Sequence, residues 1–254
     1  MSRRALIVLM ALLFAFTVLL RAPASWLLAA LPAGVECRAP AGSLWRGSCE
    51  RLQIPGAALD AVSWSLHAWP LALGHLDVDL HSADPQATGT ARVSLGIGGL
   101  RSLRQLQAEL PIDPGRLPLF PVGWTGRLEL AFDAIEFDAG RITLMEGTAT
   151  ARSLAQRNPP LAYGSYELRF SPAAQTSNAA TGGATDAPIR GELRDLGGPL
   201  AVSGALTIRN GREYQLAGLV AARPSAGAEL AKSVEYAGPA DAQGRRSFTL
   251  EGTF

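Results

Sequence analysis

The sequence predicts a mainly β protein, with an N-terminal single transmembrane helix followed by an antiparallel, curved β-sheet of half-barrel-like or sandwich form and one or two short helices. Three observations favour this fold class. An uncharged apolar run lies near the N-terminus, most of the remaining chain alternates apolar and polar residues, and glycine, proline or asparagine bounds most of the alternating segments. Hydrophobic residues make up 48% of the 254 residues, which is enough apolar material for a core.

The predicted helix lies in residues 5–20, which carry no charge, follow Arg3 and Arg4 and end at Arg21. The run is short for a span of about 20 residues, but flanking residues and a snorkelling arginine extend it. The alternative is a cleaved signal peptide, because residues 22–24 resemble a cleavage site. Under both interpretations the rest of the chain is exported, because the positively charged residues stay on the cytoplasmic side.

The domain organisation follows from this segment. We expect residues 1–31 to form a cytoplasmic tip, a transmembrane anchor and a membrane-proximal segment, and residues 32–254 to form an exported β-rich domain. Residues 172–188 are small and polar with nothing to bury, so they are predicted to form a mobile loop. They could equally be a long hairpin connection within one sheet.

Cys37 and Cys49 are the only two cysteines. In an oxidising compartment they could form a disulfide that closes a loop of about 13 residues and contributes ~3 kcal/mol. The alternative is a pair of small buried thiols. A metal site is disfavoured, because no histidine, aspartate or further cysteine stands at ligand spacing near them.

The strand pattern is clearest in residues 74–81, where Leu76, Val78 and Leu80 share one face and polar residues the other. Asn210 and Gly211 predict a tight type I′ hairpin turn. The same alternation predicts strands over residues 60–69, with Val62, Trp64 and Leu66 inward, and over 88–95, 126–133, 163–170, 200–209, 212–220 and 246–254.

Two segments have helical spacing. The leucines of residues 99–110 recur at intervals of three and four, and Leu230 and Val234 lie four apart within residues 226–236. Each segment predicts a short helix packed on the sheet.

Chemical motifs are missing. His67, His75 and His81 are scattered along the chain, and no nucleophile elbow or phosphate-binding loop is present. Lys and Arg total 23 against 22 Asp and Glu, without a basic run, which disfavours nucleic acid. We therefore expect no enzyme, catalytic residue, metal, cofactor or small-molecule substrate. An exported hydrolase would require the fold to bring distant serine, histidine and aspartate residues together.

Several ordered motifs resemble a known family. Gly-Ser-Leu-Trp-Arg-Gly at residues 42–47 precedes Cys49, and Val-Ser-Trp-Ser-Leu-His-Ala-Trp-Pro-Leu follows at residues 62–71. The chain closes with Tyr-Gln-Leu-Ala-Gly-Leu from Tyr214, Gly-Pro-Ala-Asp-Ala-Gln-Gly-Arg at residues 238–245 and a final Phe-Thr-Leu-Glu-Gly-Thr-Phe. This order resembles protein N of the bacterial type II (general) secretory pathway.

The resemblance implies an accessory, non-enzymatic component of the type II protein secretion system, which supports export of folded exoproteins from the periplasm across the outer membrane. It implies a single-pass protein of the bacterial inner membrane, with a cytoplasmic N-terminus and a periplasmic bulk. The implied partners are other inner-membrane secretion subunits, with membrane lipid meeting the anchor. The matching residues look structural: Gly42, Leu44, Trp45, Gly47, Trp64 and Pro70. Trp64 is expected in the core, whereas Trp45 could lock the disulfide loop or meet a partner.

A second interpretation remains open. Short alternating strands behind one N-terminal anchor are also similar to periplasmic β-groove proteins that bind or transport lipid, of the AsmA-like or lipopolysaccharide-transport type. An open, apolar, concave sheet face would favour this alternative.

Overall fold

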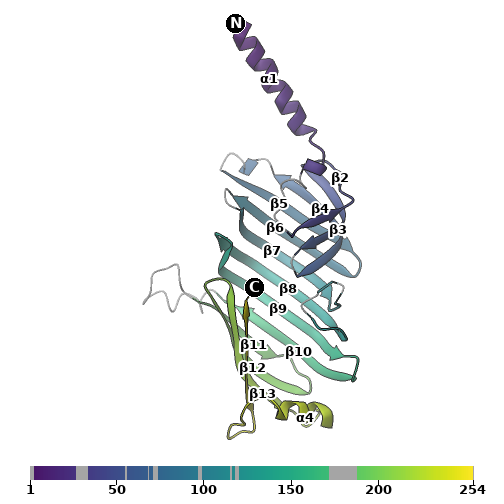
Figure 1. Ribbon diagram of the computed structural model, residues 1–254, viewed down its shortest axis with the longest axis vertical. Helices are drawn as coiled ribbons and strands as arrows, with labels where there is room; N and C mark the ends of the chain where they lie inside the picture. The colour runs from purple at the N-terminus through teal and green to yellow at the C-terminus, as the bar shows by residue number, and fades with distance from the viewer. Residues whose placement is uncertain are drawn as a thin grey trace.

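The structure describes a long N-terminal helix, a large sheet and a short helix near the C-terminus (Figure 1). The computed structural model describes residues 3–26, 34–54, 56–67, 69–70, 74–96, 99–114, 116–117, 120–171 and 188–253. Helix α1 (Arg3–Leu20) extends away from the sheet, whereas α4 (Ala228–Glu235) lies at the opposite end of the molecule (Figure 1). Within the described residues, no helix combines the length and the apolar character of a membrane span.

A single antiparallel sheet of 14 strands contains every described strand. From β3 onward each strand pairs with the next along the chain, and β1 and β2 both pair with β3. The strands are β1 (Glu36–Arg38), β2 (Ala41–Gly42), β3 (Arg46–Ile54), β4 (Ala57–His67), β5 (His75–Asp84), β6 (Ala87–Gly96), β7 (Gly99–Pro111), β8 (Trp124–Asp138), β9 (Arg141–Gln156), β10 (Leu161–Phe170), β11 (Ile189–Asp195), β12 (Leu200–Arg209), β13 (Glu213–Ala222) and β14 (Arg246–Thr253).

This topology confirms the mainly β, antiparallel prediction, but the described strands do not form the sandwich that was one predicted form. Twist accumulates between neighbouring strands, and in Figure 1 the strands β11 to β14 stand at a steep angle to the central strands. The alternation correctly predicted β4, β5, β6, β8, β10, β12, β13 and β14. It did not single out β3 or β9.

The helix predicted over residues 99–110 is wrong, because these residues form β7. The pairing of β6 with β7 shifts twice, between Thr90 and Arg92 and between Ser94 and Leu95, and each shift adds a residue to β7. A bulge of this kind turns a spacing of two into a spacing of three on one face of a strand. Two bulges therefore bring leucines with nearly helical spacing to one side of a strand.

The other local predictions fare better. The segment 226–236 does contain a helix, α4, in which Leu230 and Val234 are buried. Asn210 and Gly211 have φ of 52° and 63°, as a type I′ turn requires.

Residues 172–187 lie outside the described residues, but Phe170 of β10 pairs with Gly191 of β11. The segment therefore connects neighbouring strands of one sheet.

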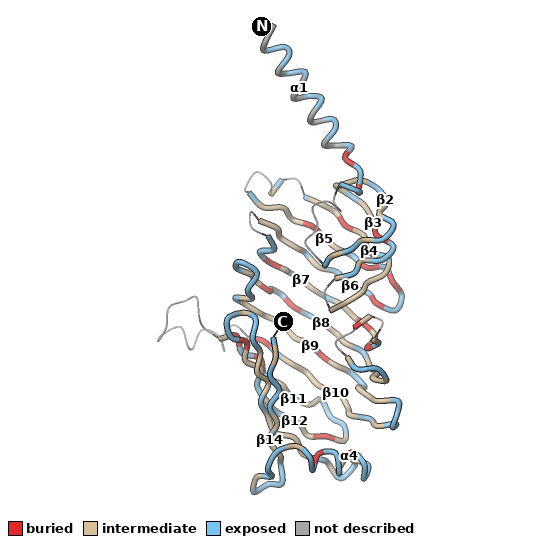
Figure 2. The backbone as a smooth tube through the Cα atoms, viewed as in Figure 1, coloured by how far each residue is buried: buried red, intermediate tan, exposed pale blue. Residues whose placement is uncertain are grey.

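The core is divided among four clusters along the sheet. Buried residues are scattered singly along the strands in Figure 2, and most of the sheet is only partly buried. Ile208 is the large side chain with the least exposure among those described, at 2%. The described sheet therefore has several small packed clusters along its length.

Candidate functional site: an apolar sheet face and its joint to the helix

One face of the sheet carries three continuous rows of mostly apolar side chains, each residue directly opposite the next across the strands. Row A contains Leu66, Val78, Val93, Leu103, Ile135 and Met145. Row B contains Leu106, Phe132, Gly147, Phe170, Gly191, Leu206, Leu216 and Leu250. Row C contains Ala108, Leu130, Ala149, Leu168, Leu193, Gly204, Gly218 and Phe248. Together the rows form the apolar face.

The apolar face is incompletely covered. Most of its side chains are only partly buried, and Leu250 is 58% exposed. Among the described elements, extensive contacts join neighbouring strands, and the one helix that packs on the sheet is α4, against β13 near one end. Large proteins normally bury such a face under a second layer, so this surface can accept apolar groups from outside the described chain.

Glycines shape row B. Phe132 and Phe170 flank Gly147, with ring centroids 6.0 Å apart. A Cβ on Gly147 would lie 2.3 Å from the carbonyl oxygen of Ala131, and one on Gly191 would lie 2.7 Å from the Phe170 ring. Aromatic rings therefore occupy the space that glycine leaves open on the neighbouring strand.

The opposite face of the sheet is charged. Arg92 Nε lies 2.7 Å from Asp79 Oδ1 across β5 and β6, and Arg194 Nη2 lies 2.7 Å from Glu167. The hydrogen bond from Arg92 lowers the pKa of Asp79 below its ordinary value. His67 Nε2 is 3.6 Å from the same carboxylate. The pair of Arg92 and Asp79 is exposed on both sides, and exposed ion pairs contribute little each to stability.

All the predicted motif residues except Pro70 lie where α1 joins the sheet. The indole Nε1 of Trp64 donates to the carbonyl oxygen of Leu44 at 3.1 Å, and the backbone N–H of Leu66 donates to that of Trp45 at 2.8 Å. Leu44 N–H donates in turn to the carbonyl of Ala22, just after α1, at 2.8 Å. These bonds attach the segment after the helix to the turn before β3, and that turn to β4.

Two glycines of the motif make this joint possible. A Cβ on Gly47 would lie 2.3 Å from Cζ2 of Trp64, so only glycine leaves room for the indole ring. Gly42 has φ of 89°, which favours glycine. Pro70 follows Trp69 beyond the end of β4, and Trp69 is 84% exposed. The motif is thus structural for most of its residues.

Cys37 and Cys49 form a disulfide between β1 and β3, with Cα atoms 5.7 Å apart. Cys49 is 2% exposed and packs in the cluster that holds Trp64 and Val62. The bond ties the short first strand to the same end of the sheet as the joint.

One partly buried ion pair, between Arg223 and Asp195, was not predicted from the sequence. Arg223 Nη2 lies 2.6 Å from Asp195 Oδ1, and Arg223 also donates to the carbonyl oxygens of Gly198 and Leu200, each at 2.9 Å. Burial raises the pKa of nearby Tyr166 to about 12, helped by the charge of Asp195. The turn that follows Asp195 was a signal in the sequence for a hydrogen-bonding aspartate. Its partner Arg223, however, lies 28 residues further along the chain.

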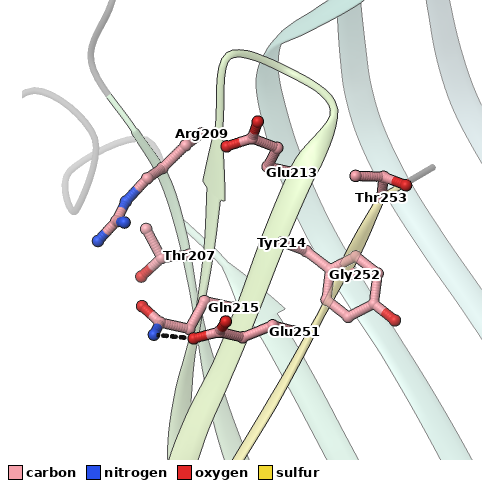
Figure 3. Close-up of a pocket in the computed structure, with 8 residues that line it drawn as sticks. All are labelled: Thr207, Arg209, Glu213, Tyr214, Gln215, Glu251, Gly252 and Thr253. Atoms are coloured by element: carbon pink, nitrogen blue, oxygen red, sulfur yellow. Dashed lines mark hydrogen bonds between the residues drawn. The ribbon is translucent and has the colours of Figure 1, made fainter.

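A shallow hollow of approximately 350 Å³ lies on the last strands (Figure 3). Its lining includes Arg209, Glu213 and Tyr214, and Gln215 donates to Glu251 at 2.6 Å. The described residues contain no group of three histidine, cysteine, aspartate or glutamate side chains that could hold a metal ion.

The fold and these sites define a single-sheet β protein that presents an apolar surface and a structural joint, rather than an assembled catalytic cluster among its described residues. Comparison with known proteins gives the family: the chain belongs to the type II secretion system protein N family, whose model matches residues 33–249. The family resemblance of the motifs is thereby confirmed.

Two relatives bear the same description, type II secretion system protein N. The protein of Vibrio cholerae serotype O1 is 31% identical over 137 residues, which is 52% of this chain and 54% of that protein, so the match spans about half its length. The protein of Aeromonas hydrophila is 24% identical over 229 residues, or 86% of this chain and 84% of that protein. No solved structure matches the chain.

Proposed function

We propose that this chain is a non-enzymatic accessory component of the type II secretion system, which supports export of folded exoproteins from the periplasm across the outer membrane. The observation that carries the proposal is the family match over residues 33–249. The site supports it, because the residues of the family motif build a joint between helix and sheet rather than a reaction centre.

The proposal assigns residues 1–31 to a cytoplasmic tip, a single-pass anchor in the bacterial inner membrane and a membrane-proximal segment, and residues 32–254 to a periplasmic domain. Helix α1 exposes Leu6, Ile7, Met10 and Phe14, which supports a lipid environment. An 18-residue helix is about 27 Å long, slightly less than a bilayer core of about 30 Å. The anchor therefore needs the residues that flank α1.

The proposed partners are other inner-membrane subunits of the secretion system, reached through the anchor or the sheet. Deleting the gene in its native host and measuring exoprotein release tests the function, with the intact gene restored as the control. Unchanged release would refute a necessary role, and failure of the tagged protein to co-purify with any secretion subunit would refute membership in the assembly. N-terminal sequencing of the mature protein decides between a retained anchor and a cleaved signal.

A second candidate function is favoured by the apolar face. Rows B and C cross eight strands, which is a distance of about 33 Å at the usual strand spacing. The face is two to three rows deep and only partly buried, so it suits the acyl chains of a phospholipid. We include lipid binding or transfer as the alternative function on this ground.

Adjacent residues of β10 provide a matched test. Leu168 lies in row C, and Arg169 points to the charged face, 3.2 Å from Glu167. Native mass spectrometry of gently extracted full-length protein should show bound phospholipid for the wild type and for Arg169→Gln, and loss of that lipid for Leu168→Glu. A lipid-free wild type, or equal lipid content in all three proteins, would refute the lipid function without touching the secretion role.

A further inference from the structure

Among the described strands, the last one leaves most of its outer edge unpaired. β14 pairs with β13 through eight consecutive residue pairs without a register shift. On its other side, the described residues make one bridge, from Ala240 to Arg246, and Gly238 approaches the carbonyl oxygen of Ser247 so closely that a Cβ there would lie 2.6 Å away. From Phe248 to Thr253, no described strand pairs with this outer edge.

The two ends of the sheet differ. At the first end, the three-residue β1 and the two-residue β2 share the edge of β3, and the disulfide pins β1 to it. Short, interrupted edges of this kind prevent further strand pairing. β14 has no proline and no bulge, and its Leu250 is 58% exposed. The open edge at β14 therefore has the features of a strand-pairing surface.

The apolar face also ends at this open edge. Row B ends at Leu250 and row C ends at Phe248, while Thr249 and Glu251 alternate onto the charged face. A strand that extends the sheet must therefore present apolar residues on one side and polar residues on the other. β14 itself has this pattern.

We propose that β14 pairs with β14 of a second copy of this chain, antiparallel and about a two-fold axis that passes between the two Leu250 residues. A two-fold axis perpendicular to the sheet keeps both apolar faces on the same side and makes the contact self-complementary. It places Leu250 opposite Leu250 of the second copy, Phe248 opposite Gly252 of the second copy, and Thr249 opposite Glu251 of the second copy.

An arrangement already present in the sheet selects this register. The ring of Tyr214 covers Gly252, where a Cβ would lie 2.6 Å from the phenol oxygen. Phe248 of the second copy would lie on the other side of this glycine. The order aromatic, glycine, aromatic then reproduces Phe132, Gly147 and Phe170 of row B.

The neighbouring symmetric registers are worse. Centring the pairing on Glu251 would place two glutamates directly opposite each other, which is destabilising. Centring it on Thr249 would require the outer edge at Ser247, which Gly238 already approaches. The register centred on Leu250 avoids both conflicts and uses residues 248–252.

Cysteine cross-linking of the full-length protein in detergent tests the register. Opposite Cα atoms at a two-fold antiparallel pair lie about 4.5 to 5.5 Å apart, within the range of a disulfide. Under mild oxidation, Leu250→Cys should form a covalent dimer at least ten times faster than Thr249→Cys or Leu196→Cys. Leu196 is a control of comparable exposure, at 40%. Cross-linking of Leu250→Cys no faster than the controls would overturn the register.

Sedimentation equilibrium tests the association itself. Pairing along one strand edge buries less area than a standard stable interface of about 1,600 Å², so the wild type should dimerise reversibly with rising concentration. Leu250→Lys places two like charges at the axis and should weaken association at least tenfold, with unchanged circular dichroism because Leu250 is exposed. A wild type that stays monomeric at every concentration would overturn the proposal. Cross-linking of Leu250→Cys in membranes to a chain of different mass, without homodimer, would also overturn it and identify another occupant.

Discussion

The contact between Gly47 and Trp64 provides the sharpest test of the joint between helix and sheet. Gly47 does not have a positive φ, so alanine is compatible with its backbone conformation. The difficulty is space, because a Cβ would lie 2.3 Å from Cζ2 of Trp64 and 2.6 Å from the carbonyl oxygen of Ala41. We therefore expect Gly47→Ala to act mainly by displacing the indole ring.

The expected magnitude follows from two effects. Forcing an additional methyl into a packed site costs about 1 to 3 kcal/mol. Moving the ring also breaks the 3.1 Å bond from its Nε1 to Leu44, which is worth about 1 kcal/mol. The sum is about 3 kcal/mol, which lowers the melting temperature by about 6 to 12 °C in a protein of this size.

A double-mutant cycle separates the ring from other causes. In a Trp64→Leu background the ring is gone, so Gly47→Ala should cost only about 1 kcal/mol, owing to the remaining contact with Ala41. The assay is thermal and urea unfolding of full-length protein in detergent, followed by circular dichroism. If the two substitutions prove additive within about 0.5 kcal/mol, the ring does not explain the glycine and the reasoning is refuted.

Three further measurements test other parts of the structure. Ile208→Ala removes a side chain that is 2% exposed, so it should cost about 3 kcal/mol in the free energy of unfolding; a loss below about 1 kcal/mol would contradict the burial. Denatured, unreduced protein should contain no free thiol, because Cys37 and Cys49 are paired. Detection of two free thiols would contradict the disulfide. Burial of Asp195 opposes its ionisation, but Arg223 and two backbone N–H groups outweigh burial and lower its pKa. The unfolded carboxyl then binds protons at higher pH than the folded one, so this stability is present above about pH 4 and is lost as the pH falls further. The urea midpoint of Asp195→Asn should fall less between pH 6 and pH 3 than that of the wild type, and parallel curves would exclude this role.

Local patterns in the sequence predicted a large share of the fold. Alternation located strands such as β4, whose Val62 and Trp64 are buried as expected, because the pleat places every second side chain on one face. The same argument failed at β7, since bulges changed its spacing. A bulge depends on how the neighbouring strand is paired, and periodicity within one segment does not contain that information.

The candidate site was only partly predictable. The order of Gly42, Trp45, Gly47 and Trp64 indicated the family and a structural role. The contact that explains Gly47 required coordinates, because Trp64 lies on the next strand. The partner of Asp195 was missed for the same reason, since Asp195 ends β11 whereas Arg223 directly follows β13.

The sequence by itself determined the apolar N-terminal run, the strand-rich composition, the two faces of most strands and the family. Those properties are local, because each depends on residue types and on spacings within a few positions of the chain. Only the tertiary structure decided that apolar residues of successive strands align into rows A, B and C, and that no described strand pairs with the outer edge of β14 from Phe248 to Thr253. Register and strand order arise from pairing between distant segments, and one residue of slip would move each row to the opposite face.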